Sequence, residues 1–314
     1  MTPTRLMLCG RACRFAVAAL AALFFAIPAA AQGPPINTDT PIMLGLQGSG
    51  TRTFVKVVRR TQLLENGHEV DDPLERSATA TVAPFAVPYN FLSDKLQVAI
   101  VAPLVSVQLS TTEAEPSNGG IGDVQLFAKY LLYQRDRRNE TFRIASKAGV
   151  KLPTGDDEGL PVLGTGSTDY FVTTVAAWIR ARIGIYGEGI YRINTSNENV
   201  DFGDAVSYNV AFGYRLLPAI YEIYPSPQLN MYLELNGTTT GRGARRGETI
   251  QDSGQDSGQD SGGTLVFLSP GIQYVGGRRW LIEGSFQFPI VNEPNGTQLA
   301  TSWTSSFGLR VLLF

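Results

Sequence analysis

The chain alternates apolar and polar residues with a period of two along much of its length. Between residues 142 and 152, one set of alternate positions carries Phe142, Ile144, Ala148, Val150 and Leu152, and the other set includes Arg143, Lys147 and Lys151. The segments 123–132 and 280–290 repeat this pattern. Alternation of this kind is typical of β-strands with one apolar and one polar face. The pattern therefore predicts an all-β protein.

Twelve segments have the composition and length of such strands. They lie near residues 51–64, 77–89, 94–110, 120–134, 140–153, 168–180, 182–194, 204–216, 228–239, 264–275, 279–291 and 299–314. Most exceed the usual five or six residues of a strand in a soluble protein. They suit a tilted crossing of a lipid bilayer, which takes about 9–11 residues. An even number of strands is also expected for a bacterial outer-membrane barrel.

The connections between these segments alternate between short and long. Short ones are expected at Asn90–Ser93, Arg135–Asn139, around Ala181 and at Gly276–Arg278. Long ones are expected at Glu65–Arg76, Thr111–Gly119, Thr154–Ser167, Thr195–Gly203, Thr240–Gly263 and Asn292–Gln298. Leu217–Pro227 is an exception, because it is a long connection on the side of the short ones. Short periplasmic turns alternating with longer extracellular loops are typical of outer-membrane barrels. We therefore predict a single antiparallel transmembrane β-barrel of about 12 strands, which returns the terminal Phe314 to the periplasm.

The first 31 residues have the pattern of a cleaved signal peptide. Arg5, Arg11 and Arg14 precede an apolar stretch over residues 15–27, and the small residues Ala29–Ala31 follow it. Residues 32–50 are rich in proline and glycine and lack strand periodicity. We expect them to form either a periplasmic leader or a short plug in the lumen, followed by the barrel over residues 51–314.

The composition argues against several kinds of chemistry. Both cysteines, Cys9 and Cys13, lie in the expected signal peptide, so the mature chain has no thiol for a disulfide or a metal. His68 is the only histidine, and it stands in an expected loop with no G-x-S-x-G motif in the chain. The segment Gly45–Thr51 lacks the lysine of a phosphate-binding loop. We therefore expect no enzyme activity and no cofactor. The chain is mildly acidic without a basic block, so we expect no nucleic-acid partner.

A tandem repeat marks one of the long loops. The sequence Gln-Asp-Ser-Gly occurs three times between residues 251 and 262. Such a segment lacks the apolar content that would let it pack, and we expect it to be mobile. Repeat slippage in a tolerant loop accounts for it without a function, and cation binding is the alternative.

Charged residues on the polar faces are the candidates for the lining of the lumen, because an arginine or lysine facing lipid at mid-bilayer costs about 2–4 kcal/mol. They are Asp123, Lys129, Arg143, Lys147, Lys151, Arg182, Glu188, Arg192, Arg215, Glu234, Glu283 and Arg310. Two interpretations remain open. The charges either pair across a filled barrel, or they line an aqueous path and determine its selectivity.

Several short motifs resemble one family of outer-membrane proteins. They are Gly120-Ile121-Gly122-Asp123 followed by Lys129-Tyr130, Lys151-Leu152-Pro153-Thr154-Gly155, Leu163 to Asp169, Ser269 to Tyr274, and Phe288-Pro289-Ile290. In these segments the chain resembles the transporter-type barrels of the meta-pathway of phenol degradation family, from about Pro88 to Phe314. The resemblance implies a barrel that moves small, often aromatic or hydrophobic, compounds across the outer membrane. It carries over no catalytic residues, and it does not identify phenol as the substrate.

The expected function is a passive outer-membrane channel for small compounds. A structural or surface-interaction barrel with a filled lumen is the alternative, and a membrane-embedded hydrolase ranks third because of the single histidine. The expected partners are outer-membrane lipid and lipopolysaccharide, the barrel-assembly machinery that would recognise the C-terminal strand, and small-molecule solutes.

Overall fold

The computed structural model describes residues 34–197, 200–220, 226–245, 261–277 and 279–313. The expected signal peptide, most of the repeat loop and Phe314 lie outside these residues. Twelve long strands make the barrel: β1 (Ser49–Glu65), β3 (Ser77–Asn90), β4 (Leu96–Ser110), β6 (Gln125–Arg137), β7 (Glu140–Lys151), β8 (Asp169–Arg180), β9 (Ile183–Ile193), β11 (Ala205–Leu217), β12 (Gln228–Thr240), β14 (Gly263–Gly276), β15 (Trp280–Pro294) and β16 (Thr297–Leu313). Four short strands lie outside this set: β2 (His68–Glu69), β5 (Ser117–Ile121), β10 (Val200–Asp201) and β13 (Ala244–Arg245).

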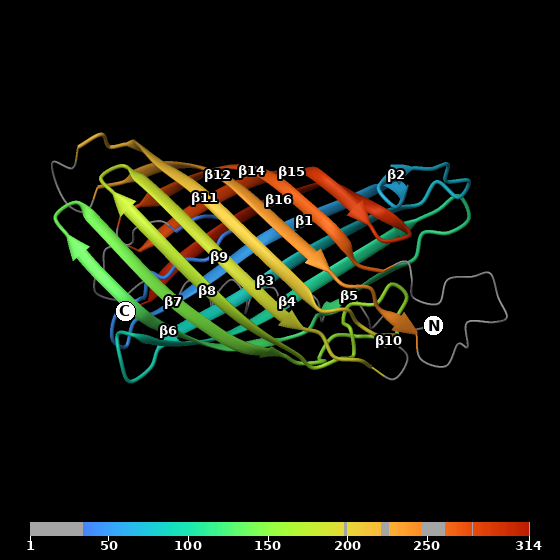
Figure 1. The fold of residues 1–314 in the computed structure, drawn as a ribbon, viewed down its shortest axis with the longest axis horizontal. Helices are drawn as coiled ribbons and strands as arrows, with labels where there is room; N and C mark the ends of the chain where they lie inside the picture. The colour runs from blue at the N-terminus through green and yellow to red at the C-terminus, as the bar shows by residue number, and fades with distance from the viewer. Residues whose placement is uncertain (1–33, 198–199, 221–225, 246–260, 278, 314) are drawn as a thin grey trace, which may run out of the picture.

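The long strands form one closed antiparallel sheet. Each pairs with its neighbours in sequence order, and β16 pairs back onto β1 from Ser49↔Leu313 to Glu65↔Thr297. The strands run obliquely around the barrel, as Figure 1 shows. Closure leaves none of the twelve with a free edge, which satisfies the backbone hydrogen bonds that lipid cannot. The predicted twelve-stranded barrel is confirmed.

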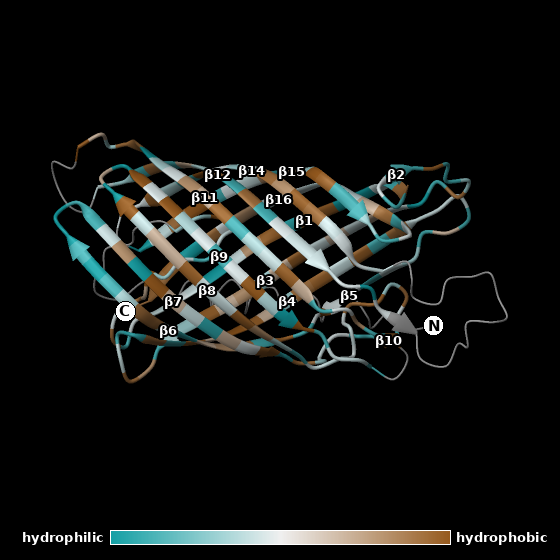
Figure 2. Ribbon diagram, in the orientation of Figure 1, coloured by the Kyte–Doolittle hydropathy of each residue, from teal (hydrophilic) through white to brown (hydrophobic). Residues whose placement is uncertain are grey.

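The two faces of the sheet differ as the alternation predicts. In β8, Phe171, Thr173 and Val175 are buried, whereas Tyr170 and Val172 are exposed on the outer face. Hydrophilic and hydrophobic positions alternate along the long strands in Figure 2. The outer face is thus an apolar surface of the kind that lies in hydrocarbon, and the inner face carries the polar side chains.

Most short connections lie at one end of the barrel and most long ones at the other; the exceptions are the long connection between β11 and β12, as the sequence predicts, and the short turn between β15 and β16. The end that holds Leu313 has tight turns, two of which use Asn139 and Ala181 with positive φ. The other end holds β2, β5 and β10 (Figure 1). By the alternation of loop lengths, the first end is periplasmic and the second extracellular.

One predicted long loop is wrong. Asn292–Gln298 was expected to connect the last two strands as an extended extracellular loop, but β15 continues to Pro294 and β16 begins at Thr297. Only Asn295 and Gly296 lie between them, and Gly296 has a φ of 63°. An Asn-Gly pair between two strands is the sequence typical of a tight hairpin turn, so this connection is short.

The segment before β1 runs through the inside of the barrel. Ile36, Thr38 and Thr40 are buried. The segment bonds to inward-facing side chains of strands from different sides of the sheet, including Glu188 on β9 and Glu234 on β12. Met43 packs against the buried Leu131, Ala145 and Val175. These contacts place residues 34–43 in the lumen, and we refer to them below as the luminal segment.

Candidate functional site

One carboxylate in the lumen binds the backbone of the luminal segment. Glu234 Oε1 accepts hydrogen bonds from the backbone N–H groups of Ile36 and Asn37, each at 3.0 Å. Its Oε2 accepts the Thr38 hydroxyl at 2.7 Å. Charge-assisted bonds of this kind are the stronger ones, and the acceptor here is fully buried. Glu234 therefore fixes the first residues of the segment to β12.

A second cluster binds the carbonyl groups of the same residues. Gln273, Arg310 and Arg52 donate to the backbone oxygens of Pro34, Pro35 and Ile36 at 2.9, 2.7 and 2.5 Å, respectively. Glu283 Oε1 joins the two guanidinium groups, at 3.2 Å from Arg52 and 2.8 Å from Arg310. The backbone donors and acceptors of the segment thus find partners in the barrel wall, as buried backbone groups require.

Asp39 forms the third attachment of the segment. Its carboxylate lies 2.8 Å from Lys129 Nζ and 3.0 Å from Lys147 Nζ, and its backbone N–H donates to Glu188 Oε2 at 3.1 Å. Burial raises the pKa of Asp39, but the two neighbouring lysines outweigh this effect and hold the pKa well below its usual value. The carboxylate is therefore ionised when the segment occupies the lumen.

This shift predicts how the attachment responds to pH. A lowered pKa in the folded state means that the ion pairs contribute fully above the ordinary value of 3.8 and are lost only as the pH falls through the lowered value. We expect conductance to stay constant between about pH 5 and pH 8, measured in planar bilayers. An opening transition inside that range that disappears in Asp39→Asn would contradict this expectation.

Two cavities remain beside the luminal segment. The larger, of about 480 Å³, reaches Pro88, Trp280 and Leu312 near the periplasmic ends of β3, β15 and β16, and we call it the periplasmic cavity. The smaller, of about 290 Å³, reaches Thr238 and Leu265 near the extracellular ends of β12 and β14, and we call it the extracellular cavity. Both are lined by Asn37, Arg52, Phe54, Ile190 and Asn209. The two cavities therefore adjoin each other alongside the segment.

The wall of the periplasmic cavity combines apolar and polar side chains. The inner faces of β3, β4 and β6 contribute apolar residues, which include Pro84, Ala86, Ala99, Val101 and Phe127. Polar residues come from the luminal segment and from the strands, and they include Asn37, Thr38, Asp39, Gln97, Gln125 and Lys129. A space lined by both kinds of side chain suits amphipathic solutes of small size.

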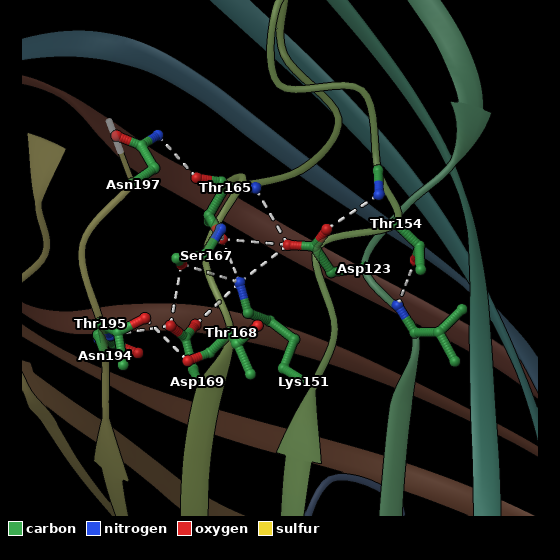
Figure 3. A network of polar contacts seen from close by, with 12 residues as sticks. Asp123, Lys151, Thr154, Thr165, Ser167, Thr168, Asp169, Asn194, Thr195 and Asn197 are labelled. Atoms are coloured by element: carbon green, nitrogen blue, oxygen red, sulfur yellow. Dashed lines mark hydrogen bonds and ion pairs between the residues drawn. The ribbon is translucent and has the colours of Figure 1, made fainter. Parts of the chain in front are cut away.

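A separate polar network ties down the long extracellular loop between β7 and β8 (Figure 3). Lys151 Nζ lies 2.9 Å from Asp123 Oδ2 and 2.8 Å from Asp169 Oδ2, and it also contacts Thr165 Oγ1. Asp123 accepts the backbone N–H groups of Gly155 and Thr165, both at 3.0 Å. Burial raises the pKa of Asp123, but these bonds and Lys151 lower it below its usual value. We call Asp123, Lys151, Thr165 and Asp169 the loop anchor.

Three of the quoted motifs meet in the loop anchor. The strand expected from residue 120 begins only at Gln125, and Gly120 and Ile121 instead end β5, which pairs with β4. This leaves Asp123 in a connection where its side chain can reach the loop. A Cβ on Gly164 would lie 2.6 Å from Asp123 Oδ1, so this position has no room for a larger residue.

The twelve sequence candidates separate into three groups by location. Lys129, Lys147, Glu188, Glu234, Glu283 and Arg310 bond to the luminal segment or to its attachment clusters. Asp123 and Lys151 belong to the loop anchor, and Arg192 is half-buried toward the extracellular end of β9. Arg143 pairs with Asp136 at 2.9 Å near the periplasmic end. At the same end, Arg182 donates to the last backbone carbonyls of β11, and Arg215 donates to the carbonyl of Pro218 just after this strand.

Sequence reasoning missed three charged residues that the structure brings into these clusters and a fourth, Lys56, that lines the extracellular cavity. Asp39 lies in a segment with no periodicity, and Asp169 stands at the very start of a strand. Arg52 and Lys56 flank Phe54 on the inner face of β1. The alternation of β1 could have indicated the last two.

Other features of the chain lie apart from the lumen. His68 is exposed on β2. Among the described residues, no group of three or more His, Cys, Asp or Glu side chains is arranged to hold a metal ion. The part of the chain that the structure describes also has no helix long and apolar enough to cross a membrane.

A closed twelve-stranded sheet with an apolar outer face and a polar lumen defines a bacterial outer-membrane β-barrel. The model of the family described as "Putative MetA-pathway of phenol degradation" matches residues 70–305. The match spans well over half of the chain, and the chain belongs to this family. None of the curated proteins has a sequence that matches it.

Solved structures are similar to this chain to different degrees. The COG4313 outer membrane channel from Pseudomonas putida F1 is similar with a TM-score of 0.67 at 14% identity, over 90% of this chain and 100% of that one. The beta domain of the Bordetella autotransporter BrkA gives a TM-score of 0.42 at 10% identity, over 84% and 98% of the two chains. The translocator domain of NalP from Neisseria meningitidis gives 0.40 at 10%, over 96% and 95%. Of these three structures, the COG4313 channel is the one whose similarity supports a shared barrel fold.

Proposed function

We propose that the chain is a passive channel of the outer membrane through which small, partly apolar solutes pass beside the luminal segment. The observation that carries this proposal is the pair of adjoining cavities, which together extend from the periplasmic toward the extracellular end of the lumen. The family and the fold of the P. putida channel support it. The apolar side chains that β3, β4 and β6 present to the periplasmic cavity favour solutes with an apolar body.

The charged lumen residues act chiefly by holding the segment in place. Six of the twelve candidates bond to it or to its attachment clusters, and the free space lies beside them. They determine the selectivity of the channel through the shape of the remaining passage and through its local charge.

A filled, structural barrel is the second candidate function. The extensive bonding of the luminal segment favours it, because every cluster that holds the segment also narrows the lumen. The two candidates differ in whether the cavities conduct.

Narrowing the periplasmic cavity tests the channel directly. Ala99 is buried on the inner face of β4, so a tryptophan there would project into the 480 Å³ space and narrow the passage. We expect Ala99→Trp to reduce the single-channel conductance in planar bilayers by about half or more. The matched control is Ala102→Trp, on the outer face of the same strand beside the exposed Leu104. Equal conductance of the two variants, with both showing normal heat-modifiable folding, would favour the filled barrel.

We further propose that the protein has no enzymatic activity. His68, the only histidine in the sequence, is exposed on β2, outside the lumen clusters described above. Contacts with lipopolysaccharide at the extracellular rim and recognition of the C-terminal strand by the assembly machinery remain predictions of the barrel fold.

A further inference from the structure

The extracellular cavity contains a lysine that has no charged partner among the residues that the structure describes. Lys56 on β1 lines this cavity, and among the described residues it makes no ion pair or hydrogen bond. The other lysines in the lumen differ, since Lys129, Lys147 and Lys151 each contact a carboxylate. An inward cation that the protein leaves uncompensated is the side chain expected where an anionic solute binds.

Buried polar atoms with unfilled hydrogen-bonding capacity line the same cavity. Ser306 faces Lys56 across the β1–β16 pairing, and its Oγ has no partner. Arg52 Nε and Gln287 Oε1 are likewise buried without partners. The side chains of Ser306 and Gln287 are 7% and 2% exposed. Buried groups of this kind are normally satisfied, so the three point to a ligand that completes their hydrogen bonds.

The donors in this set outnumber the acceptors. Lys56 Nζ and Arg52 Nε can only donate, Ser306 Oγ can donate or accept, and Gln287 Oε1 can only accept. Glu283, the carboxylate in the cavity wall, is already bound by Arg52, Arg310 and Gln273. The set of groups around the cavity therefore favours a ligand with negative charge.

The rest of the cavity wall has both polar and apolar side chains. The polar ones are Asn37, Ser207, Asn209, Asn236 and Thr238, and the apolar ones are Ile36, Phe54, Ile190, Leu265 and Phe267. A volume of about 290 Å³ limits the ligand to a small molecule. A ligand whose carboxylate is bound by Lys56 would place its apolar body against the apolar side chains.

We infer that the extracellular cavity is a binding site for a small organic carboxylate with an apolar or aromatic body, with Lys56 as its cation. This inference rests on the proposed channel function, because it places the binding site along the path that solutes take through the lumen. Gln287 Oε1 accepts a hydrogen bond from a hydroxyl of the ligand or from water. The site thus selects amphipathic acids over neutral compounds of the same size.

Calorimetric binding of benzoate and benzamide to the detergent-solubilised mature chain tests this inference. The two probes have nearly the same shape, and only benzoate is charged at neutral pH. We expect benzoate to bind at least about tenfold more tightly, which corresponds to about 1.4 kcal/mol. Lys56→Gln should abolish this preference and Lys56→Arg should retain it. The control is Lys95→Gln, in the exposed turn between β3 and β4, which should leave the preference unchanged.

Two results would overturn the inference: equal binding of the two probes to the wild-type chain, or a preference that survives in Lys56→Gln. Each variant is first checked for heat-modifiable folding. Because the assay measures binding without conduction, its outcome is separate from that of the channel. Selective benzoate binding in a chain that does not conduct would support the binding site and reject the channel. Conduction without selective binding would support the channel and reject the binding site.

Discussion

Replacing Asp39 with asparagine is expected to release the luminal segment from one wall of the barrel and to raise the conductance. The substitution leaves Lys129 and Lys147 without the carboxylate that both contact, although Lys147 keeps Glu188 at 3.9 Å. Removing one partner of a buried ion pair costs about 3–5 kcal/mol. Because each 1.4 kcal/mol is about a tenfold change in an equilibrium constant, the released state would gain on the order of 100-fold in population.

Single-channel recording of Asp39→Asn measures this release. We expect larger or additional conductance steps than in the wild-type chain. The matched control is Asp94→Asn, in an exposed periplasmic turn, which should give conductance steps of the wild-type size. Unchanged conductance steps in Asp39→Asn would mean that Glu234, Arg52 and Arg310 hold the luminal segment without the ion pairs between Asp39 and the two lysines.

The second large effect is expected at the loop anchor. Lys151→Met removes the cation between Asp123 and Asp169, both of which have little exposure to solvent. The two carboxylates then lie unpaired, which costs about 3–5 kcal/mol by the same reasoning. Asp123 also holds the backbone of Gly155 and Thr165, so we expect the loop from residue 152 to 168 to detach from the barrel rim.

Limited proteolysis with a glutamate-specific protease reports on this loop, because Glu158 is exposed near its centre. Cleavage there should be much faster in Lys151→Met than in the wild-type chain, while the β-strands stay protected. Lys95→Met provides a control for the loss of a lysine at an exposed position. Slow cleavage in Lys151→Met would show that other contacts, such as the bond from Asn118 to Asp156, hold the loop.

The strands could be predicted from sequence because a regular period of two places each side chain on a known face. Phe142 and Lys147 are examples, since their parity in β7 decides which one faces the lumen. The Asn295–Gly296 pair is itself a hairpin signal, and it could have indicated the tight turn in place of the long loop expected at Asn292–Gln298.

The attachments of the luminal segment could not be predicted in this way. Asp39 belongs to a segment without periodicity, and its partners are about 90 to 150 residues away along the chain. Only the closed barrel brings Lys129, Lys147 and Glu188 together around it. The loop anchor shows the same limit, because Asp123 and Lys151 were each recognised but nothing in the sequence paired them.

The most direct test of the account is the conductance of a barrel whose luminal segment is covalently fixed. Asn37 Nδ2 lies 3.1 Å from Ser285 Oγ, and the expected mature chain has no cysteine of its own. Asn37→Cys with Ser285→Cys can therefore be bridged by an added oxidant as a disulfide, which a reductant reverses. If solutes pass beside a segment that stays in the lumen, bridging should leave the single-channel steps at the wild-type size. Loss of the steps on bridging, and their return on reduction, would contradict the account.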